Sequence, residues 1–178
     1  MANSLPVNLD VKKLTLKDAL DLAILIEEEA ANRYLELSKS VGGRYQGDAS
    51  DMFKMMIKNE AKHMKQLKDK RKKLFKGQRR VVNRDMLFDV EAPDYGAIRF
   101  NMSARQALEV ALASEEKAFD FFAAASKVVK DARVKKLFLE LKEEEKEHKA
   151  LLKKRIAKLP KGSDVEIADI DEPGSDAG

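Results

Sequence analysis

The sequence contains only two histidines, and each follows a glutamate by three residues, as Glu60–His63 and Glu145–His148. Residues i and i+3 lie on the same face of an α-helix, so each pair would present a carboxylate and an imidazole to one point in space. Mixed imidazole and carboxylate groups are typical ligands of divalent transition metals. The two pairs therefore predict a metal site, provided that helices bring them together.

Four segments have the apolar spacing of three and four residues that is typical of helices packed in a bundle. We expect them at about 15–40, 48–75, 103–130 and 132–159. Each apolar seam is interrupted near its middle by polar residues, which are Glu27 in the first segment, Glu60 and His63 in the second, Glu115 in the third, and Glu145 and His148 in the fourth. Because all six lie near helix midpoints, packing of the helices would bring them to one level.

The two halves of the chain repeat each other. Glu27 matches Glu115 at an offset of 88 residues, and the first Glu-x-x-His matches the second at an offset of 85. The chain is thus two copies of a helical hairpin, each with a glutamate and then Glu-x-x-His. A lone buried histidine, or one Glu-x-x-His in a glutamate-rich helix, is more often structural, but the repeat favours a shared site.

Four ionised carboxylates in an apolar core are unfavourable unless they are paired or bind a metal. Two divalent cations would supply four positive charges and cancel the repulsion among the glutamates. Imidazole and carboxylate together suit iron or manganese, and zinc is an alternative. The sequence therefore predicts a dinuclear site made by Glu27, Glu60, His63, Glu115, Glu145 and His148.

Residues 76–101 lack helical periodicity and contain Gly77, Pro93 and Gly96. Helices of this length extend roughly 39 Å, and a connection of this size can run the whole length of a bundle. We therefore expect an all-α four-helix bundle with a long crossover between the second and third helices, so that the third helix starts at the opposite end. Residues 1–14 are expected to be an irregular N-terminal segment, 15–159 the bundle, and 160–178 an acidic, disordered tail.

Composition excludes several classes of protein. The chain has no cysteine, so it forms no disulfide, iron–sulfur cluster or thiolate-bound zinc site. It shows no signal-peptide pattern and no apolar run of membrane-spanning length, which predicts a cytoplasmic protein that does not enter a membrane. The basic segment 65–80 could bind nucleic acid, an acidic redox partner or the acidic tail, but with Phe75 as its only aromatic residue we do not expect nucleic-acid binding.

Over residues 15–158 the chain resembles rubrerythrins and other ferritin-like di-iron proteins. The residues that carry the resemblance are Glu27-x6-Tyr34, Glu60-x-x-His63, Glu115 and Glu145-x-x-His148. The resemblance implies that Glu60 and Glu145 bridge two iron ions, with Glu27 and His63 on one ion and Glu115 and His148 on the other. It also implies that Tyr34 donates a hydrogen bond to a bridging carboxylate across the bundle.

The chain departs from rubrerythrins in three ways. It lacks the four cysteines of a rubredoxin domain, so an external protein must donate electrons. Ala118 stands where rubrerythrins carry an extra glutamate one turn along the third helix, which puts their peroxidase mechanism in doubt. Phe122 stands where the repeat would place a second tyrosine.

The resemblance implies a non-haem di-iron oxidoreductase, forming a homodimer, that reduces hydrogen peroxide or dioxygen. A ferroxidase that stores or delivers iron is the first alternative, and a hollow particle of many subunits would distinguish it. A non-catalytic bundle that binds partners is the second alternative, and it would be favoured if removing metal left stability unchanged.

Overall fold

The computed structural model describes residues 5–41, 46–87, 90–97 and 99–159, and these form four long helices. The helices are α1 (Leu16–Ser40), α2 (Ala49–Phe75), α3 (Ala104–Val128) and α4 (Ala132–Ala157). The described part of the chain contains no strand, only an isolated bridge between Val7 and Leu87. The predicted all-α bundle is confirmed.

Each helix begins where a short polar side chain can accept a hydrogen bond from the first turn. The capping residues are Thr15, Asp48, Ser103 and Asp131. Such caps satisfy backbone N–H groups that have no partner inside the helix. At Ser103 the cap is reciprocal, because the Gln106 side chain accepts a hydrogen bond from the Ser103 backbone. The predicted helix limits therefore lie within about two residues of those observed, because local capping chemistry determines them.

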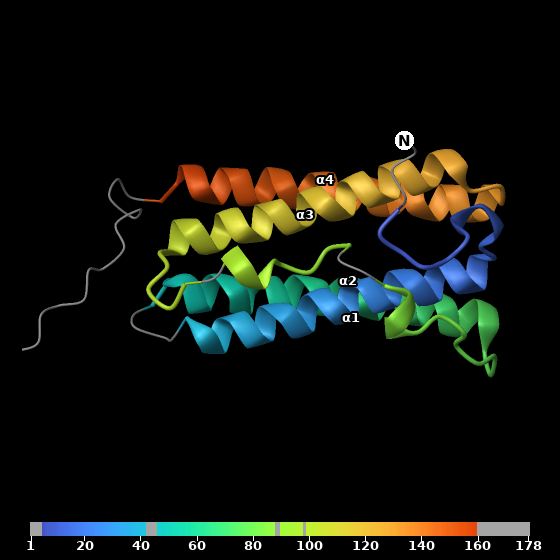
Figure 1. The fold of residues 1–178 in the computed structure, drawn as a ribbon, viewed down its shortest axis with the longest axis horizontal. Coiled ribbons are helices and arrows are strands. Elements are labelled where there is room, and N and C mark those ends of the chain that lie inside the picture. The colour runs from blue at the N-terminus through green and yellow to red at the C-terminus, as the bar shows by residue number, and fades with distance from the viewer. Residues whose placement is uncertain (1–4, 42–45, 88–89, 98, 160–178) are drawn as a thin grey trace, which may run out of the picture.

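Helices α1 and α2 form one hairpin, and α3 and α4 form the other (Figure 1). Between them, the crossover returns along the whole bundle, so that α2 and α3 run in the same direction (Figure 1). Short 3-10 turns at Arg84–Met86 and Tyr95–Ala97 interrupt the crossover. The long crossover predicted between the second and third helices is confirmed.

The apolar core is divided into two clusters by a polar layer near the middle of the bundle. On α1, buried residues from Ala19 to Ile26 belong to one cluster, and those from Ala30 to Leu37 belong to the other. Glu27 lies between them and is buried. Helix α3 divides in the same way, with Ala111 and Ala118 in different clusters on the two sides of Glu115.

Residues 5–14, ahead of α1, include a 3-10 turn at Val11–Lys13 and contribute to the core. Val7, Val11 and Leu14 are buried and join the larger apolar cluster. The Asn8 amide donates to the Met86 carbonyl oxygen at 2.9 Å, so this segment packs against the crossover. The tail expected at 160–178 lies outside the described residues. None of the described helices is long and apolar enough to cross a bilayer, and the cytoplasmic location stays a prediction.

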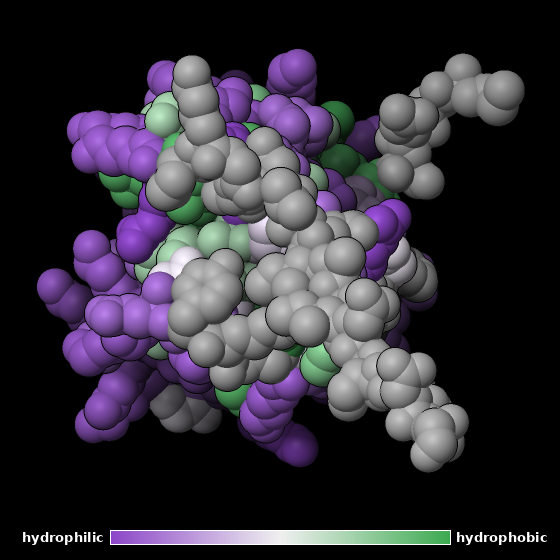
Figure 2. Space-filling model, turned by 90° about the vertical axis from the view of Figure 1, so that its left-hand side faces the viewer, coloured by the Kyte–Doolittle hydropathy of each residue, from purple (hydrophilic) through white to green (hydrophobic). Residues whose placement is uncertain are grey.

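Polar side chains surround the bundle. Figure 2 looks at the end where α1 and α4 finish and shows mostly hydrophilic residues along its left-hand side, with patches of hydrophobic ones between them. In the basic segment 65–80, several charges form ion pairs within the chain: Lys68 and Arg80 pair with Glu28, and Lys70 pairs with Glu140. These contacts reduce the charge available to an outside partner.

Candidate metal centre

The polar layer contains all six residues that the sequence analysis predicted. They form two groups, one from each hairpin, in which the potential ligand atoms lie within 4.8 Å of one another: Glu27, Glu60 and His63 in the first, and Glu115, Glu145 and His148 in the second. All four glutamates are at most 3% exposed. The repeat in the sequence is therefore a repeat in space, because equivalent positions of the two hairpins meet at one level.

The two histidines bring the two groups into contact with each other. Their rings are stacked, with centroids 4.4 Å apart and an angle of 7° between the planes. Nδ1 of His148 lies 3.0 Å from Oε2 of Glu115 and 3.4 Å from Oε2 of Glu145. Nδ1 of His63 lies 4.0 Å from Oε1 of Glu27. Each imidazole is thus placed beside the carboxylates of its own group, with the two groups in contact.

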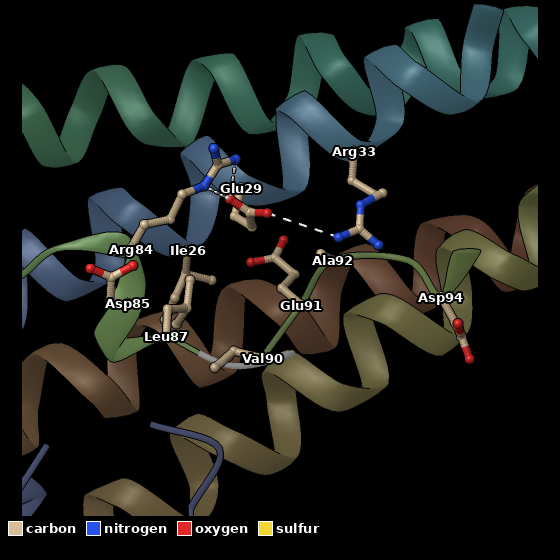
Figure 3. A pocket seen from close by; sticks show the side chains of 10 residues that line it. All are labelled: Ile26, Glu29, Arg33, Arg84, Asp85, Leu87, Val90, Glu91, Ala92 and Asp94. Atoms are coloured by element: carbon tan, nitrogen blue, oxygen red, sulfur yellow. Dashed lines mark hydrogen bonds and ion pairs between the residues drawn. The ribbon is translucent and has the colours of Figure 1, made fainter. Parts of the chain in front are cut away.

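The structure adds a fifth glutamate that the sequence analysis missed. Glu91 lies on the crossover, is 2% exposed, and has a ligand atom within 4.8 Å of both groups, in the sets Glu27–Glu91–Glu145 and Glu60–Glu91–Glu115. Figure 3 shows its side chain extending from the crossover into the space beside α1. The one signal in the sequence was its place between two apolar residues, Val90 and Ala92, ahead of Pro93.

Six carboxylate oxygens in this cluster are buried without a hydrogen-bond partner among the described residues. They are Glu27 Oε2, both oxygens of Glu60, Glu91 Oε2, Glu115 Oε1 and Glu145 Oε2. Buried polar atoms in folded proteins nearly always have partners, so a group of orphaned acceptors at one point requires an explanation. Cations bound at that point would provide one.

The cluster strongly favours protonated carboxyl groups when no cation is present. Burial, together with the charges of the neighbouring glutamates, raises the pKa of Glu27, Glu91 and Glu145 well above the usual range. Burial and the charge of Glu115 raise the pKa of Glu60 to about 7. Proton sharing is the alternative to metal binding for so many carboxylates, and bound cations would displace these protons.

The two histidines differ in their protonation. Burial, and then the charge of His148, lower the pKa of His63 to about 4, so its ring is neutral at physiological pH. Burial also disfavours charge on His148, but the contact with Glu115 outweighs it and raises the pKa of His148. A neutral imidazole is the form that coordinates a metal, and a bound cation would release any proton from His148.

Tyr34 lies about two helical turns beyond Glu27 and is fully buried, with its ring 6.1 Å from that of Phe53. Its hydroxyl group has no hydrogen-bond partner among the described residues. The hydrogen bond expected from Tyr34 to a bridging carboxylate is therefore not formed in this structure. Burial and the nearby charges of Glu115 and Glu60 raise the pKa of Tyr34, which keeps the hydroxyl group protonated and able to donate.

At the equivalent place in the second hairpin, Phe122 is an ordinary apolar core residue. Its ring lies 5.8 Å from Phe138 and 5.2 Å from Phe121. Ala118 is also buried in this cluster. Ala118 and Phe122, the two departures from the rubrerythrin pattern on α3, therefore place apolar groups between Glu115 and the rest of the larger apolar cluster.

The donor set fits a pair of divalent metal ions. Each group provides one imidazole and two carboxylates, and burial on four helices fixes their positions. Four glutamates carry four negative charges, which two divalent cations would balance, and the orphaned oxygens are the atoms free to bind them. This combination of ligands suits iron and manganese.

The comparisons with known proteins identify the family of the chain. The Rubrerythrin family model matches residues 18–95 and 106–173, so the chain belongs to the rubrerythrin family. No curated protein matches the chain at a significant level.

Two solved structures are similar to the chain. An uncharacterized conserved protein from Magnetospirillum magnetotacticum is 27% identical with a TM-score of 0.64, covering 83% of this chain and 97% of that one. A hypothetical protein from Pyrococcus furiosus is 20% identical with a TM-score of 0.53, covering 86% and 95%, and shows the shared fold alone.

Proposed function

We propose that the protein is a dinuclear iron oxidoreductase of the rubrerythrin type, which reduces hydrogen peroxide or dioxygen with electrons from an external protein. The observation that supports this most directly is the set of six orphaned carboxylate oxygens around two imidazoles in an apolar core. Membership of the rubrerythrin family supports it independently.

In this proposal Glu27 and His63 hold one ion, and Glu115 and His148 hold the other. Glu60 and Glu145, one from each hairpin, would complete the set of carboxylates around the two ions. When bound, iron supplies the electrons that reduce the oxidant. The protein positions the ligands before metal arrives, because each is fixed on a long helix whose two ends pack in separate apolar clusters.

The residues around the centre shield its carboxylates from water, whereas His148 is partly exposed. The four helical glutamates are nearly inaccessible, and the apolar clusters close the bundle on both sides. A dry environment strengthens the electrostatic attraction between carboxylates and cations. Because the chain contains no cysteine, we propose that electrons come from a separate redox protein. We also propose that the chain acts as a homodimer.

Anaerobic titration of the metal-free protein with Fe²⁺ tests the metal site. We expect saturation at two ions per chain and a higher melting temperature. At an ion concentration one hundred times Kd, each site adds about 2.7 kcal/mol, because the ion binds only the folded state. For a chain of this size that corresponds to roughly 5–10 °C for each site.

Glu60→Gln and Glu145→Gln are the matched variants, since each keeps the shape of the side chain and removes a ligand charge. Both should lose the paired site, with fewer than two ions bound, while retaining the helical circular dichroism spectrum. The iron-loaded wild-type protein should then consume hydrogen peroxide or dioxygen, measured with an oxygen electrode or a peroxide assay. Saturation at one ion, or a melting temperature that metal does not change, would contradict the proposal.

A further inference from the structure

Glu91 differs from the four helical glutamates because it reaches the centre from the crossover. Its side chain is buried, its Oε2 has no hydrogen-bond partner among the described residues, and it lies within 4.8 Å of carboxylates from both hairpins. A crossover that served only to connect α2 to α3 would not need an acidic residue there. An apolar side chain at this position would avoid the cost of burying a charge.

Two cationic side chains hold the crossover just after Glu91. Lys117 of α3 donates a hydrogen bond from Nζ to the Ala92 carbonyl oxygen at 2.7 Å. Arg33 of α1 donates from a terminal nitrogen to the Pro93 carbonyl oxygen at 2.8 Å. One of these contacts comes from each hairpin, so the backbone beside Glu91 is fixed relative to both halves of the centre.

A pocket of about 470 Å³ lies on the outer side of Glu91, between α1 and the crossover (Figure 3). The other glutamate in this pocket, Glu29, is engaged by cations: Arg84 donates a hydrogen bond to it at 2.5 Å, and Arg33 lies 3.9 Å from it. The pocket therefore contains two glutamates with different surroundings. Glu29 is paired on the surface side, whereas Glu91 joins the buried carboxylates.

We propose that Glu91 is a fifth carboxylate ligand of the metal centre, delivered by the crossover, and that Arg33 and Lys117 are the residues that position it. This proposal rests on the dinuclear metal site proposed above. Glu91 would provide, from the crossover, a carboxylate in addition to those of the four helices.

The charge balance gives Glu91 a specific effect. Four carboxylates balance two divalent cations, and the fifth makes the centre negative by one charge. An additional negative charge stabilises the more highly charged, oxidised metal pair more than the reduced pair. Glu91 should therefore lower the reduction potential of the centre as well as tighten metal binding.

Glu91→Gln, with Glu29→Gln as the matched control, tests the proposal. Both variants remove one negative charge from the same pocket, but only the first removes the buried carboxylate. We expect Glu91→Gln to weaken binding of Mn²⁺ to the metal-free protein by at least about tenfold, as for other residues that complete metal sites. It should also change the visible absorption of the Co²⁺-loaded protein, which reports the coordination number. Glu29→Gln should leave both unchanged.

A redox titration of the iron-loaded protein gives a second readout. The midpoint potential of Glu91→Gln should be higher than that of the wild type, and that of Glu29→Gln should match the wild type. Circular dichroism and the metal-free melting temperature of each variant confirm that the bundle is folded.

The positioning role is tested by a double-mutant cycle. Lys117→Met should reproduce part of the loss in Mn²⁺ affinity, and adding it to Glu91→Gln should cause little further loss. A merely structural role of Lys117 would give losses that add. Additive losses would therefore overturn the assignment of Lys117.

The outcomes separate this proposal from the one that it depends on. If the wild type binds two ions and Glu91→Gln matches it in affinity, Co²⁺ absorption and potential, Glu91 is not a ligand but the dinuclear site stands. If the wild type binds fewer than two ions, both proposals are overturned.

Discussion

Two levels of this bundle hold buried carboxylates whose surroundings are opposite. Asp21 of α1 is fully buried, but Arg71 of α2 binds both of its oxygens, and Lys17 lies 3.3 Å from it. At the level of Glu60, five carboxylates converge, and six of their oxygens have no hydrogen-bond partner among the described residues. One helix, α1, contributes to both levels.

The difference separates a structural charge from a charge that is prepared for a ligand. The Asp21 carboxylate has its cations on the same chain, so it links α1 to α2 whether or not metal is present. Arg71 extends this link by donating to the Gln78 carbonyl oxygen at 3.0 Å, at the start of the crossover. Apart from the contact between Glu115 and His148, the glutamates of the polar layer lack such partners among the described residues, and bound cations would supply them. Burial alone does not indicate a functional site; burial without partners does.

Of the variants that test this comparison, we expect Arg71→Met to have the largest effect on stability. Arg71→Met would leave Asp21 buried with Lys17 as its nearest cation, and losing one member of a buried ion pair costs about 3–5 kcal/mol. Because Lys17 and Arg80, which lies 3.9 Å from Asp21, remain, we expect about 3 kcal/mol, or roughly 6–12 °C in melting temperature. Calorimetry of the metal-free and metal-loaded proteins should show the same loss in both.

The double variant Asp21→Leu/Arg71→Met is the matched control. It removes both charges and replaces them with apolar groups of similar size, so it should recover most of the lost stability. Lys65→Met, which breaks the exposed pair with Asp69, should change stability by less than about 0.5 kcal/mol. If Arg71→Met behaved like Lys65→Met, the Asp21 pair would not be a structural link.

The second effect is a dependence of metal-free stability on pH, which the glutamates of the polar layer should produce and the Asp21 pair should not. In the metal-free protein the pKa of Glu60 is raised to about 7, so the folded state holds protons that the unfolded state releases near pH 4.5. This contribution to stability is complete below pH 4.5 and is lost as pH rises through about 7. A pKa difference of one corresponds to about 1.4 kcal/mol, and we expect Glu60 alone to contribute a loss of about 2.5 kcal/mol between pH 5 and 8, with further losses from Glu27, Glu91 and Glu145.

Thermal melts at several pH values, with and without metal, provide the measurement. Metal should reverse the trend, because cations compete with protons and bind better as pH rises. Glu60→Gln removes one titrating carboxyl group and should make the metal-free curve shallower. If the metal-free protein were more stable at pH 8 than at pH 5, the carboxylates of the polar layer would have hydrogen-bond or cationic partners that this structure does not show among the described residues.

The fold could be predicted from the sequence because local signals specify it. Apolar spacing marks the four helices, and Thr15, Asp48 and Ser103 mark where helices begin. The 88- and 85-residue offsets indicated that two hairpins would face each other. The buried ion pair between Asp21 and Arg71 could not be predicted. The two residues are 50 positions apart, and Arg71 is one of many cations in the basic segment 65–80.

The candidate site could be predicted in the helices but not in the crossover. A glutamate on a helix can be assigned to the core because its neighbours at three and four residues are apolar. Glu91 has no such periodicity around it, and its burial depends on how Arg33 and Lys117 fasten the crossover. The hydrogen bond expected from Tyr34 depends on atomic positions that no spacing rule specifies.

The smallest effect that we expect concerns Tyr34, whose buried hydroxyl group has no hydrogen-bond partner among the described residues. Tyr34→Phe removes this hydroxyl group, so metal-free stability should stay the same or rise by up to about 1 kcal/mol. Phe122→Tyr, the matched change in the other hairpin, should lower stability by about 1–3 kcal/mol, because it places a hydroxyl group in the apolar cluster. If Tyr34 donates to a carboxylate once metal is bound, Tyr34→Phe should instead destabilise the metal-loaded protein by about 1 kcal/mol. Equal effects of Tyr34→Phe with and without metal, measured by calorimetry, would show that the tyrosine is only a core residue.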